Sequence, residues 1–290
     1  MATNVAPDPK RPSLEPGRTS LERLKIARKP PPPPWVALAQ RAGNFLEHMG
    51  QLGRLLFEAT AAIFKKPFEY EATVYQLEQL GVRSLGIAVA TAVFTGMVMS
   101  VQFAFSLQQF GGMEYTGRVI GLSFSRELAP TLTAVIVGGR IGSGIAAEVG
   151  AMAVTEQIDA IRALGADPVK KLVLPRLLAG TILMPVLGAL ALVLGFTGAM
   201  LIADLQFGIP SGFFLRTALG SLRFRDFAMG MMKCPFFGAI TALVGCHFGL
   251  ITRGGTEGVG QSTTRAVVAV TISILVSDFV LTKLGIVLFG

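Results

Sequence analysis

The sequence predicts an all-α integral membrane protein with an N-terminal interfacial amphipathic helix, five transmembrane helices and a short helix on the cytoplasmic side. Of its 290 residues, 51% are hydrophobic and 15% are charged, and the mean hydropathy is +0.59. This composition is typical of membrane proteins, and apolar segments long enough to cross a bilayer recur along the chain. The 34 glycines also favour close packing of helices in lipid.

Residues 1–34 form a basic, proline-rich tail that ends in the run Pro30–Pro34. The tail has too little apolar character to form a core, so we expect it to be disordered. It lacks the apolar stretch of a secretory signal peptide. The net charge of +8 does not require a nucleic-acid partner, because the basic residues gather in this tail and beside the apolar spans.

The segment from Trp35 to Phe64 carries one apolar stripe, with charged residues over the rest of its surface. Such a helix cannot cross hydrocarbon, so we expect it to lie in the membrane interface with Trp35 as an anchor. A second amphipathic piece follows at about 71–82, which extends the interfacial part over residues 35–82. The alternative is a soluble helix that packs on a neighbouring domain.

Five spans are predicted from the apolar segments. They cover residues of about 85–107, 119–149, 172–203, 227–251 and 266–289. Pro130 lies inside the second span, where we expect a tilt or a break. The basic tail and Arg162 lie on one side of this arrangement, which places the N-terminus in the cytoplasm. An odd number of spans puts the C-terminus on the opposite side.

The most polar run in the middle of the chain, Glu148–Pro168, lies between the second and third spans. Thr155 is placed to cap a short helix at about 155–165, and Gly165 is placed to end it. This helix offers an apolar ridge and charged groups to a partner in water, although packing on its own protein is the alternative. The candidate contact residues are Glu156, Gln157, Ile158, Asp159, Ile161, Arg162 and Leu164.

Small residues recur at helical spacing in the second span, where they allow helices to approach closely. Packing inside one subunit and a seam between two subunits are both open as explanations. The residues are Gly138, Gly139, Gly142 and Ser143. The sequence shows no metal-ligand cluster and no catalytic set. Gly112–Arg118 has the glycine spacing of a phosphate-binding loop but lacks its lysine, so no cofactor is expected in this chain.

Several ordered motifs occur at defined positions along the chain. They are Glu127-Leu-Ala-Pro130, Gly139-Arg140-Ile-Gly142-Ser143, Ala147-Glu148-Val-Gly150, Thr155-Glu156-Gln157-Ile-Asp159-Ala160, Thr263-Thr264-Arg265 and Asp278-Phe-Val-Leu281. Together they resemble the MlaE/YrbE permease family, the membrane subunits of lipid-transporting ABC systems that work with MCE-domain proteins. The resemblance covers about Val36 to Gly290, so residues 35–290 would form one permease domain.

The resemblance implies a permease subunit that performs no bond chemistry itself and moves lipid, expected to be phospholipid, in a bacterial inner membrane. The family implies a homodimer with a lipid cavity open to the periplasm, an MCE-domain periplasmic partner and, as a further subunit, a STAS-type protein. A separate ATPase subunit would bind ATP and dock on the helix at 155–165, the coupling helix of this family. The C-terminus would be periplasmic.

Intramembrane charges are the remaining candidates, because a charge at such depth is costly and needs a partner or water. At 1.5 Å per residue, Glu127, Lys233 and Asp278 lie about 12, 9 and 16 Å from the periplasmic ends of their spans. We therefore expect Lys233 to be shared between Glu127 and Asp278. Arg126 is expected close enough to balance the remaining negative charge or to attract a lipid phosphate. A transport role and a structural role are both open.

Two other function classes fit the same residues. An ion-coupled secondary transporter would use Glu127 and Asp278 as its ion site and would need no ATPase. A non-transporting membrane scaffold would lack a lipid-sized cavity and would not alter the activity of an ATPase.

Overall fold

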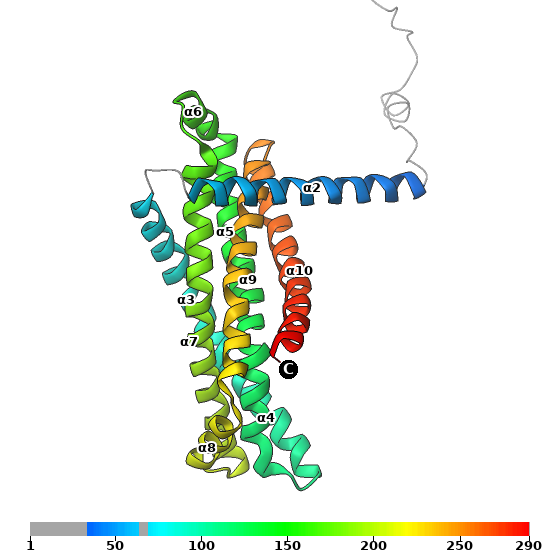
Figure 1. Cartoon of the computed structure of the whole chain (residues 1–290), viewed down its shortest axis with the longest axis vertical. Coiled ribbons are helices and arrows are strands. Elements are labelled where there is room, and N and C mark those ends of the chain that lie inside the picture. The colour runs from blue at the N-terminus through cyan, green and yellow to red at the C-terminus, as the bar shows by residue number, and fades with distance from the viewer. Residues whose placement is uncertain (1–33, 64–68, 290) are drawn as a thin grey trace, which may run out of the picture. The chain divides into compact units, whose positions relative to one another are not determined.

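The computed structural model describes residues 34–63 and 69–289, which are helical with short connections and contain no strand (Figure 1). The all-α prediction is confirmed. The chain divides into two units, Met1–Met49 and Gly50–Gly290. In the first, the described residues 34–49 are helical and begin α2 (Pro34–Ile63). The predicted disorder of the tail falls on residues that lie, apart from Pro34, outside the described part of the chain.

The second unit contains the remaining helices and five candidate membrane spans. The helices are α3 (Tyr70–Gln109), η1 (Met113–Tyr115), α4 (Thr116–Ser123), η2 (Phe124–Leu132), α5 (Thr133–Val154), α6 (Gln157–Ala163), η3 (Val169–Val173), α7 (Leu174–Phe207), α8 (Ser211–Ser221), α9 (Phe224–Leu250) and α10 (Gly255–Phe289). The candidate spans are Tyr70–Gln109, Met113–Val154, Val169–Phe207, Phe224–Leu250 and Gly255–Leu288. The helix α2 is not among them, and its placement in the membrane interface stays a prediction.

The first span is longer than the sequence predicts. Residues 71–82 and 85–107 belong to the single helix α3, where the sequence predicts an interfacial piece followed by a separate span. A continuous seam of small buried residues faces α7 and runs through the expected boundary, so nothing interrupts the helix. The seam contains Gly81, Ser84, Ala88, Ala92, Gly96, Ser100 and Ala104.

The second span changes its helix type at Pro130. Residues Phe124–Leu132 form a π-helical stretch between α4 and α5. Proline has no backbone N–H to donate, and a π-helical turn is one way to accommodate this without ending the helix. The irregularity lies where the sequence places a tilt or break, but the helix continues through it.

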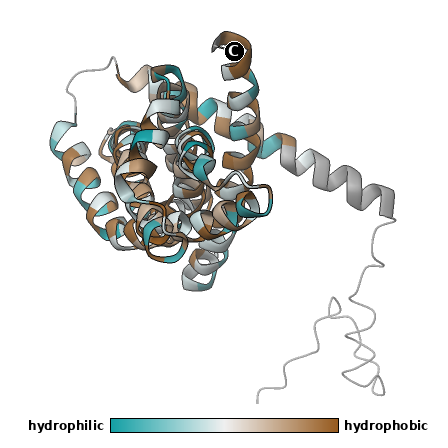
Figure 2. Ribbon diagram, turned by 90° about the horizontal axis from the view of Figure 1, so that it is seen from below, coloured by the Kyte–Doolittle hydropathy of each residue, from teal (hydrophilic) through white to brown (hydrophobic). Residues whose placement is uncertain are grey.

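The helices α5, α7 and α9 form the centre of the second unit, with α3 against α7 and α10 against α5 and α9. One core cluster of the unit includes Val137, Ile145 and Leu187, and a second includes Phe237. Large apolar side chains also point away from this core, among them those of Phe94, Val193 and Phe279. These exposed apolar side chains suit contact with lipid chains, and Figure 2 shows that hydrophobic residues are frequent along the helices.

The helix α8 is absent from the sequence-based prediction. Gly208 adopts a left-handed conformation and ends α7, and Pro210 then precedes the first turn of α8. Phe214 of α8 is buried, and α8 packs on α4. Gly117 of α4 allows this close approach, because a side chain there would meet the backbone of Phe214. The pair α4 and α8 lies at the opposite end of the unit from α6 (Figure 1).

Candidate functional site

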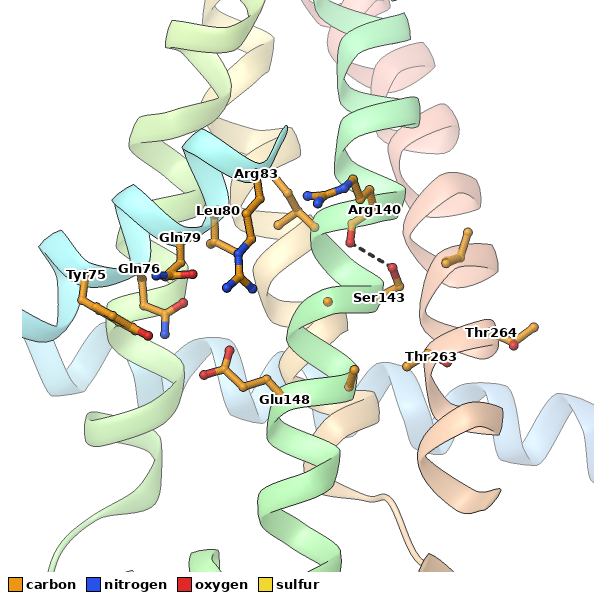
Figure 3. Close-up of a pocket in the computed structure, with 14 residues that line it drawn as sticks. Tyr75, Gln76, Gln79, Leu80, Arg83, Arg140, Ser143, Glu148, Thr263 and Thr264 are labelled. Carbon is orange, nitrogen blue, oxygen red and sulfur yellow. Dashed lines mark hydrogen bonds between the residues drawn. The ribbon is translucent and has the colours of Figure 1, made fainter. Parts of the chain in front are cut away.

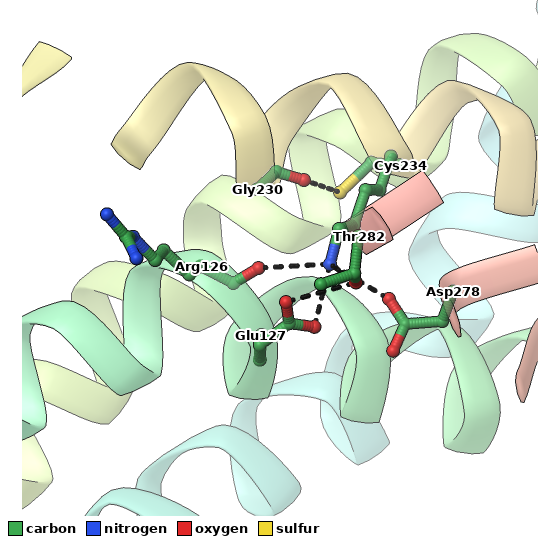
Figure 4. A network of polar contacts seen from close by, with 7 residues as sticks. Arg126, Glu127, Gly230, Cys234, Asp278 and Thr282 are labelled. Atoms are coloured by element: carbon green, nitrogen blue, oxygen red, sulfur yellow. Dashed lines mark hydrogen bonds and ion pairs between the residues drawn. The ribbon is translucent and has the colours of Figure 1, made fainter. Parts of the chain in front are cut away.

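Lys233 of α9 links its own helix to η2 and α10 inside the candidate membrane spans. Figure 4 shows its partners Glu127, Asp278 and Thr282 close to one another. Its Nζ lies 2.7 Å from Glu127 Oε2 on η2 and 3.0 Å from Asp278 Oδ1 on α10. It also donates to Thr282 Oγ1 at 2.7 Å, and Thr282 in turn donates to Glu127 Oε1 at 3.1 Å. These four residues form the lysine cluster, in which Lys233 is shared between the two carboxylates as the sequence predicts.

In the lysine cluster, the lysine side chain is buried, and the two carboxylate side chains are more exposed. The Lys233 side chain is 4% exposed, whereas the side chains of Asp278 and Glu127 are 18% and 39% exposed. Two carboxylates face one ammonium, so the cluster carries an excess of one negative charge when all three groups are ionised. A buried ammonium depends strongly on such partners, because an uncompensated charge in low dielectric is costly.

The guanidinium of Arg126 pairs with a residue outside the lysine cluster. Its Nε donates to Asp226 Oδ1 at 2.9 Å, and the two side chains form an ion pair at the first turn of α9. Only the backbone carbonyl of Arg126 faces Lys233, at 3.4 Å. Adjacent residues on a helix point in different directions, so Glu127 turns toward the cluster while the Arg126 guanidinium points away (Figure 4). The prediction that Arg126 balances the cluster's charge is wrong, whereas the alternative, that Arg126 attracts a lipid phosphate, stays a prediction.

An apolar crevice of about 130 Å³ lies beside the lysine cluster, between α9 and α10. Lys233 is its only charged lining residue, and the other lining groups are hydrocarbon or thioether side chains and one glycine. They are Met229, Met232, Phe236, Leu281, Leu284, Gly285 and Leu288. The arrangement can place an apolar chain next to a charged group, which is the combination that an amphiphile offers.

The helix α6 connects α5 to the η3–α7 span and exposes charged groups. Asp159 and Arg162 are exposed and form an ion pair of 2.8 Å along the helix. Leu164 follows the helix and is 85% exposed, while Ile161 packs partly against the core. Ile158 is only 4% exposed and belongs to the core. The prediction that Ile158 contacts a partner is therefore wrong, because the side chain is already covered by its own protein.

The start of α6 also differs from the prediction. Thr155 donates its hydroxyl to the carbonyl of Ala151, so it belongs to the end of α5 and does not cap α6. Glu156 occupies the position before the helix, with a left-handed φ of 61° and no side-chain cap. Gly165 follows the helix with φ of 76°, a conformation that glycine adopts without strain. The predicted end of the helix is confirmed.

An ion pair that sequence reasoning missed links α5 to α7, the helices on either side of α6, and joins a buried arginine to a more exposed carboxylate. Arg176 of α7 lies 2.8 Å from Glu148 Oε1 on α5 and donates to the carbonyl of Leu172 at 2.7 Å. The Arg176 side chain is 3% exposed. In the sequence, this ion pair is indicated only by an arginine next to Pro175 in an otherwise apolar run. Its partner Glu148 lies on another helix, so sequence spacing does not identify it.

The predicted small residues of α5 pack mostly inside the subunit. A side chain at Gly142 would meet Val270 at 2.7 Å, and one at Gly138 would meet Thr241 at 2.9 Å. Gly139 is also buried, and Val267 lies 3.7 Å from the position of its missing side chain. Ser143 instead lines an open cleft and donates to the carbonyl of Arg140. For the three glycines, the structure favours packing within the subunit over a seam between copies.

Comparison with known proteins places this architecture in a family. Residues 73–284 match the family described as Permease MlaE. The chain belongs to the MlaE permease family. It is the membrane component of an ABC transporter, and such a permease implies an ATPase partner. The lysine cluster and α6 both lie within the matched range.

Three curated relatives illustrate the match. The chain is 42% identical over 212 residues to a probable ABC transporter permease of Synechocystis sp., covering 73% of this chain and 81% of that protein. It is 34% identical over 248 residues to a probable ABC transporter permease of Rickettsia conorii, covering 86% of this chain and 96% of that protein. It is also 40% identical over 221 residues to the chloroplastic protein TRIGALACTOSYLDIACYLGLYCEROL 1 of Arabidopsis thaliana, spanning 76% of this chain but 63% of that protein.

Proposed function

We propose that this MlaE permease moves phospholipid between a bacterial inner membrane and a periplasmic MCE-domain partner. It would act as a homodimer with a separate ATPase subunit, and a STAS-type protein would be an accessory. The observation that carries the lipid assignment is the apolar crevice beside Lys233, which combines a hydrocarbon surface with a buried charge. The name of the Arabidopsis relative refers to a lipid, which supports the same class of cargo.

The proposed orientation follows from the positions of α6 and the lysine cluster. With α6 in the cytoplasm, Glu127 lies before the whole of α5 and thus toward the periplasmic side. The 22 residues of α5 span about 33 Å at 1.5 Å per residue. A single helix therefore connects the exposed charges of α6 with the segment η2 that carries Glu127. Movement of α6 on ATP binding would shift η2 relative to α9 and α10, where the other members of the cluster lie.

The homodimer is supported by the incomplete burial of α10. Among the five candidate spans, this helix is the least buried within the second unit. It carries exposed apolar residues together with Asp278 and Thr282 of the cluster. A second copy beside α10 would enclose the crevice and screen the more open carboxylates from the surrounding lipid. A lipid cavity between two subunits would then include the lysine cluster in its wall.

An ion-coupled transporter is the second candidate, because Glu127 and Asp278 are partly exposed intramembrane carboxylates. Identifying what co-purifies with the protein separates the candidates. Mass spectrometry of the protein extracted gently from its native membrane should identify an ABC ATPase, an MCE-domain protein and bound phospholipid. A protein that is purified alone, without any ATPase or lipid, would contradict the proposed function.

A further inference from the structure

A polar cleft of about 710 Å³ lies between α3, α5 and the start of α10, well away from the lysine cluster. Figure 3 shows Gln76, Arg83 and Glu148 around the same open space, with Arg140 above it on α5. Arg140 is 13 residues from Glu127 in the sequence, which corresponds to about 20 Å along a helix. Ligands bound in the cleft and at the lysine cluster would therefore occupy separate sites.

The cleft has an excess of positive charge. Neither Arg83 nor Arg140 forms an ion pair with any residue in the described ranges 34–63 and 69–289. Arg140 is held by a hydrogen bond of 3.1 Å to the buried hydroxyl of Ser84. The one carboxylate in the lining, Glu148, is already paired with Arg176. Two guanidinium groups are thus available to an anion, and guanidinium geometry suits phosphate oxygens.

The cleft also contains a hydrogen-bond acceptor without a donor. Gln76 is 6% exposed, lines the cleft, and its Oε1 has no hydrogen-bond partner among the described residues. A buried unsatisfied carbonyl costs about 1–3 kcal/mol. A ligand that brings a hydroxyl or an ammonium group to this oxygen would remove that cost. The cleft therefore combines two anion-binding cations with an acceptor that requires a donor.

The position of the cleft indicates the source of the ligand. Its residues come from the parts of α3, α5 and α10 that lie toward the α6 end of the second unit. In the proposed orientation, this end is the cytoplasmic half of the membrane, where Arg140 lies within a candidate span. An arginine at such depth without an ionic partner is rare unless it faces water or a ligand.

We propose that this cleft binds the headgroup of a phospholipid from the cytoplasmic leaflet, with its phosphodiester on Arg83 and Arg140. A headgroup hydroxyl or ammonium would donate to Gln76. Glycerol and ethanolamine headgroups share this chemistry, whereas choline has no such donor. The assignment of the leaflet depends on the proposed function, but the binding of the headgroup does not.

The test uses isothermal titration calorimetry to measure binding of dihexanoyl phospholipids to the detergent-purified full chain. The glycerol and ethanolamine lipids are expected to bind more tightly than the choline lipid. Arg83→Gln should weaken binding of all three by about tenfold, as expected for a lost charged hydrogen bond. Arg253→Gln is the matched control, because it removes an exposed arginine from the same end of the unit outside the cleft lining. It should bind like the unmodified chain.

Gln76→Leu gives an independent readout of the headgroup. It should abolish the preference for glycerol and ethanolamine over choline while Arg83-dependent binding remains. Equal affinities for Arg83→Gln and Arg253→Gln would overturn the proposal. Inorganic phosphate binding as tightly as the lipids would also overturn it, since the cleft would then be a simple anion site. Failure of ATP-driven lipid transfer with intact, Arg83-dependent binding would contradict the proposed function and leave this inference standing.

Discussion

Lys233→Met alone should destabilise the protein more than the triple variant Lys233→Met, Glu127→Gln, Asp278→Asn. The single change leaves two carboxylates close together without their ammonium partner, whereas the triple change leaves three neutral side chains. Breaking a buried pair costs about 3–5 kcal/mol, and the exposure of Glu127 places the expected loss near the lower end of this range. Thermal unfolding in detergent, followed by circular dichroism, measures the difference between the two variants.

The control for this prediction is the exposed ion pair between Arg54 and Glu58 on α2. Arg54→Met removes a cation of a solvent-exposed pair, so its effect on the unfolding temperature should be small. If Lys233→Met and the triple variant unfold at the same temperature, the three side chains do not stabilise one another, and the cluster is not a mutual one.

Exchanging the charges of Asp159 and Arg162 should release the ATPase from the permease. The double variant Asp159→Arg, Arg162→Asp keeps an ion pair along α6, because the two residues lie three positions apart and are both exposed. The helix should therefore remain folded, while the charge pattern presented to a partner is reversed. We expect co-purification of the ATPase to fall by at least about tenfold, since like charges at an interface cost several kcal/mol.

The matched control reverses the pair on α2 with Arg54→Glu and Glu58→Arg, which are also exposed and one helical turn apart. This variant should retain the ATPase. Undiminished co-purification with the α6 variant, in a protein that elutes at its normal size, would show that these charges do not form the docking surface.

The sequence predicts those features that depend on local composition. The apolar segments predict five spans, and the structure has five candidate spans. The depths of Glu127, Lys233 and Asp278 along their spans predict that the three side chains meet, as they do in the structure. Features that depend on side-chain direction were less predictable. Depth alone does not separate Arg126 from Glu127, and only the path of η2 shows that the two side chains diverge.

Long-range packing accounts for the other differences. The amphipathic pattern of residues 71–82 suits an interfacial helix equally well, and the seam against α7 that extends α3 is visible only in three dimensions. Ile158 has the spacing of an exposed ridge, but the core of the same chain covers it. The pair of Glu148 and Arg176 joins distant parts of the sequence, so neither residue identifies its partner.

We propose that this permease moves phospholipid with energy from ATP that a partner subunit hydrolyses. The most direct test is transfer of labelled phospholipid from proteoliposomes that contain the permease with its ATPase to a purified MCE-domain protein. We expect transfer that requires ATP and stops when the ATPase is omitted or when the Asp159 and Arg162 charges are exchanged. Equal transfer without the ATPase, driven by a proton or sodium gradient and lost in Glu127→Gln, would contradict it.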